Sequence, residues 1–170
     1  MNAARIRPSR ATARSAARLA AAQALFQIEQ QGAAAADVVD EFRLFRLRDD
    51  ESGDLPDLTA SDAEWFAKLV LGLDARAAEV DAALAGALPS GWKMPRLDSV
   101  VRAILRLACF ELIARDEVPA RSVIDEYVSL ARAFFDGKEP GFVNGVLDGL
   151  ARRLRPAEFT ADHGAARESG

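Results

Sequence analysis

The sequence predicts an all-α protein, and three observations carry this prediction. Apolar residues recur at intervals of three and four along most of the chain, which is the period of an amphipathic helix. No segment shows the alternation of apolar and polar residues that indicates a half-buried strand. Glycine and proline residues divide the chain into helical segments, at Gly32, Pro56, Pro119 and Pro140.

Length and composition exclude several classes of protein. The 170 residues suffice for one domain with a hydrophobic core but are few for two. No apolar run approaches the roughly 18 residues that span a bilayer, and the single cysteine, Cys109, fits a reducing, cytoplasmic compartment. The only histidine, His163, lies in a tail of small residues. No phosphate-binding loop, dinucleotide fingerprint or metal-binding spacing is present, so we expect neither an enzyme nor a cofactor or metal ion.

Charge is distributed unevenly along the chain. The net charge is −4, from 22 basic and 26 acidic residues. The first 18 residues contain five arginines and no acid, so the remaining 17 basic and 26 acidic residues leave the rest of the chain at −9. An acidic body with a basic N-terminal arm predicts that the arm binds a polyanion, whether RNA, DNA or anionic lipid. The five arginines are Arg5, Arg7, Arg10, Arg14 and Arg18.

The basic arm leads into the first predicted helix. Pro8 ends regular structure before about residue 10, Thr12 is a candidate N-cap, and Gly32 stops the helix. The arm also has the composition of a mitochondrial transit peptide, but no cleavage-like break separates it from the helix. Arg14 and Arg18 share one face near the helix start, where cations oppose the macrodipole, and a bound anion would explain their presence.

The first helix carries two apolar stripes. The main stripe, which we assign to the core, consists of Ala17, Ala21, Ala24, Leu25 and Ile28. A second stripe lies roughly 120–140° away, at about 100° per residue, and consists of Leu19, Ala22 and Phe26. This stripe either packs on another helix of the chain or docks a partner protein, and the residues alone favour packing within the chain.

The segments between the first helix and the centre of the chain are less regular. Residues 34–47 predict a short second helix, and residues 48–61 predict an exposed acidic loop. The apolar residues that the second helix is expected to bury are Val38, Val39, Phe42 and Leu44 or Phe45. Ser61 and Glu64 form a capping-box pattern that opens a long helix over residues 62–88, which Gly72 can divide in two. Its inner face is expected to include Trp65, Phe66, Leu69, Val70, Leu73, Val80 and Leu84.

Residues 97–112 form the segment around which the other helices are expected to pack. Asp98 is the predicted N-cap, and apolar residues cover most of the helix circumference, which is typical of a central helix with neighbours on several sides. Glu111 is the one acid in the apolar sector. A buried acid can be catalytic, but we favour a structural role with Arg115, one turn later, as the donor.

Prolines open the last two predicted helices, at residues 119–135 and 140–155. The final helix contains Gly145 and Gly149 one turn apart. Two glycines cost roughly 2 kcal/mol together in an isolated helix. We therefore expect the backbone of a neighbouring element to approach them closely.

These segments divide the chain into three parts. Residues 1–11 form the basic, flexible arm, and residues 12–155 form a single all-helical domain. Residues 156–170 are predicted to be a disordered tail.

Four of these segments resemble the NusB family of bacterial transcription antitermination factors. They are QALFQIEQ in the first helix, RAILRLACFEL in the central helix, VPARSVIDEYVSLARAFF in the next and FVNGVLDGLARRLR in the last. The resemblance covers roughly residues 10–155, although residues 33–60 match poorly. It implies an all-helical fold, a compact bundle of about seven helices in two subdomains, and a role without catalysis.

The resemblance also implies partners. Proteins of this family pair with a small-subunit ribosomal protein, NusE, and bind the boxA element of nascent single-stranded RNA, chiefly in ribosomal RNA leaders. The complex joins the elongating RNA polymerase as part of an antitermination complex. The expected protein is thus a cytoplasmic adaptor without a membrane partner, and its oligomeric state, a homodimer included, stays open.

Site residues follow from the same resemblance. The expected RNA-binding residues are Arg5, Arg7, Arg10, Arg14 and Arg18, with Lys138 as a further candidate in the turn before the last helix. The second stripe of the first helix becomes the partner-binding face, and the expected residues are Leu19, Ala22, Phe26 and Val101. Relatives often carry a charged residue at the position of Val101, so its contact here would be apolar. Asn144 and Asp148 are expected to cap or brace a neighbouring helix, and Phe142 to pack in the core.

Two alternatives compete with this interpretation. The same fold forms the N-terminal domain of some ribosomal RNA cytosine methyltransferases, but the catalytic domain of such an enzyme is not in this sequence. A membrane-surface protein or a general RNA-binding module could also use the basic arm. Against membrane binding, the arm has no Trp, Phe or Leu before Leu19 to insert into a bilayer.

Overall fold

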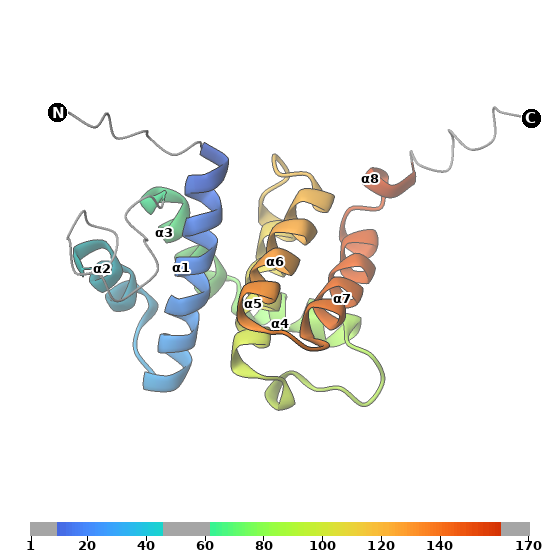
Figure 1. Cartoon of the computed structure of the whole chain (residues 1–170), viewed down its shortest axis with the longest axis horizontal. Helices are drawn as coiled ribbons and strands as arrows, with labels where there is room; N and C mark the ends of the chain where they lie inside the picture. The colour runs from blue at the N-terminus through green and yellow to red at the C-terminus, as the bar shows by residue number, and fades with distance from the viewer. Residues whose placement is uncertain (1–9, 46–61, 161–170) are drawn as a thin grey trace, which may run out of the picture. The chain divides into compact units, whose positions relative to one another are not determined.

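The computed structural model describes residues 10–45 and 62–160, and within these residues every regular element is a helix (Figure 1). The all-α prediction is therefore confirmed. The chain divides into two compact units, Met1–Ala75 and Arg76–Gly170, in agreement with the two subdomains that the family resemblance implies. Residues 1–9 of the arm, the whole acidic loop at residues 48–61 and residues 161–170 lie outside the described residues.

The first unit contains three packed helices. They are α1 (Arg10–Gln31), α2 (Ala35–Phe45) and α3 (Ala63–Ala75), and α1 packs against both of the others. The small side chains of α1 allow this close packing, because Ala17, Ala21 and Ala24 are fully buried. Phe42 of α2 stacks on Phe66 of α3 with 5.3 Å between ring centroids. The core of this unit is thus an alanine face of α1 against aromatic and aliphatic side chains of α2 and α3.

The ends of these helices differ from the sequence prediction. Helix α1 begins at Arg10, so Thr12 lies inside its first turn and is not the N-cap. Asp62 caps α3, because its Oδ1 accepts a hydrogen bond from the backbone N–H of Trp65 at 2.9 Å. Ser61, the predicted capping residue, lies outside the described residues. Leu44 and Phe45, one of which was expected to point inward, are both exposed, because the buried face of α2 ends at Phe42.

The second unit is built around its central helix. Its elements are α4 (Ala77–Ala87), a short 3₁₀ helix η1 (Met94–Arg96), α5 (Ser99–Ala114), α6 (Ala120–Phe134), α7 (Glu139–Leu154) and α8 (Ala157–Thr160). Helix α5 packs against α4, α6 and α7, and ten of its 16 residues are buried. Asp98 is the N-cap and accepts hydrogen bonds from the backbone N–H groups of Val100 and Val101. The predicted central helix is confirmed for this unit.

The long helix predicted over residues 62–88 divides into α3 and α4. The division occurs at Arg76, with φ −119° and ψ 22°, whereas Gly72 remains inside α3. Arg76 Nε donates to Glu79 Oε2 at 2.8 Å, so this residue closes the first turn of α4. The boundary between the two units lies at the same place, between Ala75 and Arg76.

One buried arginine joins the last helices of the second unit to α5. Arg155, the C-cap of α7, is 8% exposed and uses all five guanidinium N–H donors. The acceptors are four backbone carbonyls, those of Glu111, Leu112, Arg115 and Val118, and the carboxylate of Glu158. Because the last carbonyls of a helix have no partner inside the helix, Arg155 completes the C-terminus of α5.

The predicted disordered tail is wrong for its first residues. Helix α8 follows Arg155, and its Phe159 is buried. The carboxylate of Glu158 accepts a hydrogen bond from the backbone N–H of Ala120 at 2.9 Å, which fixes α8 to the start of α6. The single-domain boundary at residue 155 therefore falls too early, because an aromatic side chain four residues further on belongs to the core.

Two other sequence expectations concern polar and small residues of this unit. Glu111 is fully buried, and its Oε2 accepts a hydrogen bond from the hydroxyl of Tyr127 on α6.

Gly145 and Gly149 are exposed, and a Cβ added at either would have no atom within 4 Å. The expected close approach of a neighbouring backbone is therefore wrong within the described residues. Both glycines lie inside α7, but no neighbouring element in the described part of the chain packs against them to offset their low helix propensity.

Candidate nucleic-acid and partner interface

The start of α3 is fastened to the basic N-terminal part of α1. The backbone N–H of Asp62 donates to the carbonyl of Ala13 at 3.0 Å, and the Asp62 carboxylate caps the turn that contains Trp65. These two hydrogen bonds bring the indole ring of Trp65 against the face of α1 that carries Arg14 and Arg18.

Both arginines lie at the same aromatic ring. The Cζ atom of Arg14 is 4.0 Å from the centroid of the Trp65 ring, and that of Arg18 is 5.8 Å away. Both distances lie within the range of a cation–π interaction. Trp65 is 4% exposed and Arg18 is 5% exposed, whereas Arg14 remains partly exposed. We call Arg14, Arg18 and Trp65 the arginine–tryptophan cluster.

The electrostatic environment of the cluster favours an external anion. The first turn of α1 contains no acid, and positive side chains there oppose the helix macrodipole. The two acids at the start of α3 are engaged elsewhere, since Asp62 caps the helix and Glu64 pairs with Lys68 at 3.1 Å. Among the described residues, Arg14 Nε is buried without a hydrogen-bond partner. Arg14 thus presents positive charge that neither of these two carboxylates neutralises.

The other expected RNA-binding residues belong to the second unit, lie outside the described residues or are described by their backbone alone. Arg5 and Arg7 are outside them, and Arg10 is described only as the first residue of α1. Lys138 belongs to the second unit, where it is exposed and directly precedes α7. The structure therefore brings together two of the six predicted RNA-binding residues, and the roles of all six stay predictions.

The predicted partner-binding residues differ in the surface that they expose. Phe26 is 40% exposed and Leu19 is half-buried, so the second stripe of α1 presents an apolar surface. Ala22 and Val101 are each 3% exposed. In this structure neither of these two offers surface to a partner, whereas the phenyl ring of Phe26 does.

The residues of the FVNGVLD motif have separate local roles in α7. Phe142 is half-buried and packs on the exposed ring of Trp92, with 5.0 Å between centroids. Asp148 accepts a hydrogen bond from Arg152 one turn later at 3.0 Å, so it braces its own helix and not the expected neighbour. Asn144 is exposed and does not cap a helix.

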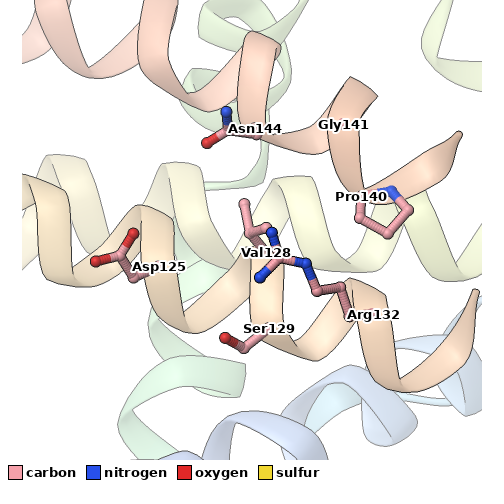
Figure 2. A pocket seen from close by; sticks show the side chains of 7 residues that line it. All are labelled: Asp125, Val128, Ser129, Arg132, Pro140, Gly141 and Asn144. Carbon is pink, nitrogen blue, oxygen red and sulfur yellow. The ribbon is translucent and has the colours of Figure 1, made fainter.

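Asn144 instead lines a groove of about 280 Å³ between α6 and α7 (Figure 2). Figure 2 shows Asp125, Ser129 and Arg132 on α6 across from Asn144 on α7. The groove presents a carboxylate and a guanidinium together. A phosphate backbone would meet repulsion from Asp125, so this groove is not favoured as part of a nucleic-acid site.

The remaining reactive groups fit structural roles. Cys109 is fully buried in α5, and burial, with the negative charges of Asp81 and Glu79, raises the pKa of its thiol to about 12. The thiol is therefore protonated at neutral pH and is a poor nucleophile. In the described part of the chain, no group of three or more acidic, histidine or cysteine side chains could hold a metal ion. None of the helices described is long and apolar enough to cross a membrane.

Trp65 is the residue of this cluster that sequence reasoning missed. Helical periodicity assigns it to the inner face of α3, which is correct, but periodicity says nothing about which side chains of α1 it meets. The nearest signal in the sequence is the pair of arginines at a helix start with no acid beside them.

Comparisons with known proteins agree with each other. The model of the NusB family matches residues 15–152. The transcription antitermination protein NusB of Maricaulis maris (strain MCS10) is 48% identical over 151 residues, which cover 89% of this chain and 93% of the relative. That of Caulobacter vibrioides (strain ATCC 19089 / CIP 103742 / CB 15) is 46% identical over 142 residues, or 84% of this chain and 94% of the relative.

Solved structures show the same likeness in three dimensions. The structure of T. maritima NusB superposes with a TM-score of 0.69 at 28% identity, over 86% of this chain and 96% of that one. A crystal structure of antitermination factors NusB and NusE in complex with dsRNA superposes with a TM-score of 0.66 at 26% identity, over 82% and 96% of the two chains. Sequence, family model and fold therefore lead to one conclusion: the chain belongs to the NusB family.

Proposed function

We propose that this protein is a transcription antitermination factor that binds boxA-type single-stranded RNA together with the ribosomal protein NusE. It then acts on elongating RNA polymerase, chiefly during ribosomal RNA transcription. The observation that carries the proposal is the match to transcription antitermination proteins over nearly their whole length, at 48% identity for the relative from Maricaulis maris. The solved complex of NusB and NusE with dsRNA supports NusE and RNA as the two kinds of partner.

The proposal gives the two surfaces of α1 separate tasks. The basic N-terminal part, which begins with the arm and includes Arg14, meets the phosphates of the RNA and supplies affinity without sequence readout. Phe26, further along the same helix, meets NusE through its exposed ring. Unpaired bases are then read by stacking and by contacts to their edges, at a site that the protein and NusE complete jointly.

In this proposal the protein is an adaptor. It changes transcription by holding RNA and NusE in one complex, in the cytoplasm and without a catalytic step of its own. The buried, protonated Cys109 and the structural hydrogen bond between Tyr127 and Glu111 support this, because neither group is placed to react with a substrate.

Fluorescence anisotropy with a boxA-like single-stranded RNA tests the proposal. Binding is measured with and without NusE, against a scrambled RNA of the same length, and over a range of salt concentrations. We expect tighter and sequence-selective binding when NusE is present. If all five N-terminal arginines met phosphates, log Kd would change with log salt with a slope of magnitude about 3.5, from roughly 0.7 per phosphate on single strands.

Three results would contradict the proposal. Equal affinity for both RNAs, unchanged by NusE, would identify a general RNA-binding helical module. A salt slope near zero would show that the arginines do not meet phosphates. Co-sedimentation with anionic liposomes that survives high salt would favour a membrane-surface role instead.

A further inference from the structure

We infer that Trp65 is a positioning residue for RNA binding, which holds the guanidinium of Arg14 in place for a phosphate, whereas Arg18 serves the fold. The inference rests on the proposed function, because it concerns the same RNA site. It goes beyond that function by giving the three members of the arginine–tryptophan cluster different roles.

The contact with Trp65 uses one part of the Arg14 guanidinium and leaves its hydrogen-bond donors available. A cation–π interaction uses the flat face of a guanidinium, whereas hydrogen bonds to a phosphate use its N–H edges. The Cζ of Arg14 lies 4.0 Å from the ring centroid, which is direct contact. Trp65 can therefore restrain the Arg14 side chain without occupying the donors that an RNA phosphate needs.

The neighbouring acids strengthen this interpretation. A carboxylate would also restrain an arginine, but it would occupy the N–H edges and neutralise the charge. Asp62, the acid next to the cluster in sequence, is used by the N-cap of α3, and Glu64 is used by Lys68. An aromatic ring in place of a carboxylate keeps Arg14 ordered and still positive.

Burial separates Arg14 from Arg18. Arg18 is 5% exposed and its Cζ is 5.8 Å from the ring centroid, so it offers little surface to a ligand. Arg14 lies one turn nearer the N-terminus and is partly exposed. A long side chain loses conformational entropy when it binds a phosphate, and a stack that restrains it beforehand reduces this loss. The ordered and accessible cation of the cluster is Arg14.

The test compares RNA affinity in four variants of the full chain, with NusE present: Trp65→Leu, Trp65→Phe, Arg14→Gln and the double variant Arg14→Gln/Trp65→Leu. We expect Trp65→Leu to weaken binding of the boxA-like RNA about threefold to tenfold, in line with the strength of a cation–π contact. Trp65→Phe, which keeps an aromatic face, should recover most of this loss. In the Arg14→Gln background, Trp65→Leu should have almost no further effect.

A salt titration gives a second readout that a purely structural role would not change. Arg14→Gln should reduce the magnitude of the salt slope by about 0.7, the contribution of one phosphate contact on a single strand. Arg18→Gln should lower the melting temperature but leave this slope unchanged. Arg43→Gln is the matched control, because it removes an exposed positive charge from α2 of the same unit outside the cluster, and it should change the Kd less than twofold.

Each negative result has a distinct meaning. Wild-type protein that shows no selective RNA binding overturns the proposed function and this inference together. Selective wild-type binding with equal Kd values for Trp65→Leu and wild type overturns the inference alone. Two further results overturn the inference alone. In the first, Arg14→Gln and Trp65→Leu weaken RNA binding independently in the double variant. In the second, Trp65→Leu also weakens binding to NusE, which indicates a general loss of structure. If Trp65→Leu does not fold, equal salt slopes for Arg14→Gln and Arg18→Gln contradict the assignment.

Discussion

Replacing Arg155 with methionine is expected to lower the free energy of unfolding by about 2–6 kcal/mol, because it leaves two buried backbone carbonyls without a donor at about 1–3 kcal/mol each. The guanidinium donates to four backbone carbonyls at the C-terminal end of α5 and in the turn that follows. Methionine fills much of the same volume but removes this donor. The carbonyls of Glu111 and Arg115 keep a backbone N–H donor, whereas those of Leu112 and Val118 lose the hydrogen bond from Arg155. Each unsatisfied buried carbonyl costs about 1–3 kcal/mol.

Urea unfolding followed by circular dichroism measures this loss. Arg155→Lys should recover only part of it, because an ammonium cannot reproduce the planar fork that reaches several carbonyls at once. Arg132→Met is the matched control in the same unit, since Arg132 is exposed on α6. It should change stability by less than about 0.5 kcal/mol. An Arg155→Met protein within 1 kcal/mol of the control, about the net value of one ordinary hydrogen bond, would contradict this account of the network.

Replacing Phe26 with aspartate is expected to weaken binding to NusE at least about 30-fold, which corresponds to a 2 kcal/mol hot spot. Phe26 is 40% exposed, so the substitution places a charge on the surface of α1 and not in the core. The charge would then have to be desolvated against an apolar patch of the partner. Isothermal titration calorimetry with purified NusE measures the affinity directly.

The same variant separates partner binding from RNA binding. Phe26→Asp should lower RNA affinity only when NusE is present, because the substitution does not alter the arginine–tryptophan cluster. Phe45→Asp is the matched control, since Phe45 is 71% exposed in the same unit but lies outside the predicted partner face. Unchanged NusE affinity for Phe26→Asp, or an equal loss for Phe45→Asp, would show that the face is placed wrongly.

Helices and their capping residues could be predicted largely from local sequence. The period of the apolar residues identifies α5, and the turn before it identifies Asp98 as its N-cap, because both signals lie within a few residues of their effect. The break at Arg76 could not be placed in this way. Gly72 is the residue with the lower helix propensity, yet it stays helical, since packing overrides a cost of about 1 kcal/mol.

The role of Arg155 depends on contacts between distant parts of the chain. The sequence shows three arginines at the end of α7, and nothing local distinguishes the one that turns inward. Its acceptors include the carbonyl of Leu112, 43 residues earlier, so the role exists only after α5 and α7 have packed. The predicted tail fails for the same reason, because Phe159 becomes a core residue only in the presence of that packing.

The candidate site shows the same division between local and distant signals. Arg14 and Arg18 could be selected from charge alone, and Phe26 from the second stripe of α1. That Ala22 is buried while Phe26 is not depends on how α1 packs with α2 and α3. The position of Trp65 against both arginines depends on the packing of α1 on α3. Helical periodicity gives no information about which helices pack together.

The most direct test of antitermination is the fraction of elongating RNA polymerase that passes a terminator. The assay uses a template with a boxA leader upstream of the terminator, in a transcription extract depleted of this protein and then supplied with it. We predict that the wild-type protein raises read-through on this template but not on one with a scrambled boxA, and that Phe26→Asp and Arg14→Gln restore it less. Read-through that does not respond to the wild-type protein, or that rises equally on both templates, would contradict the proposed function.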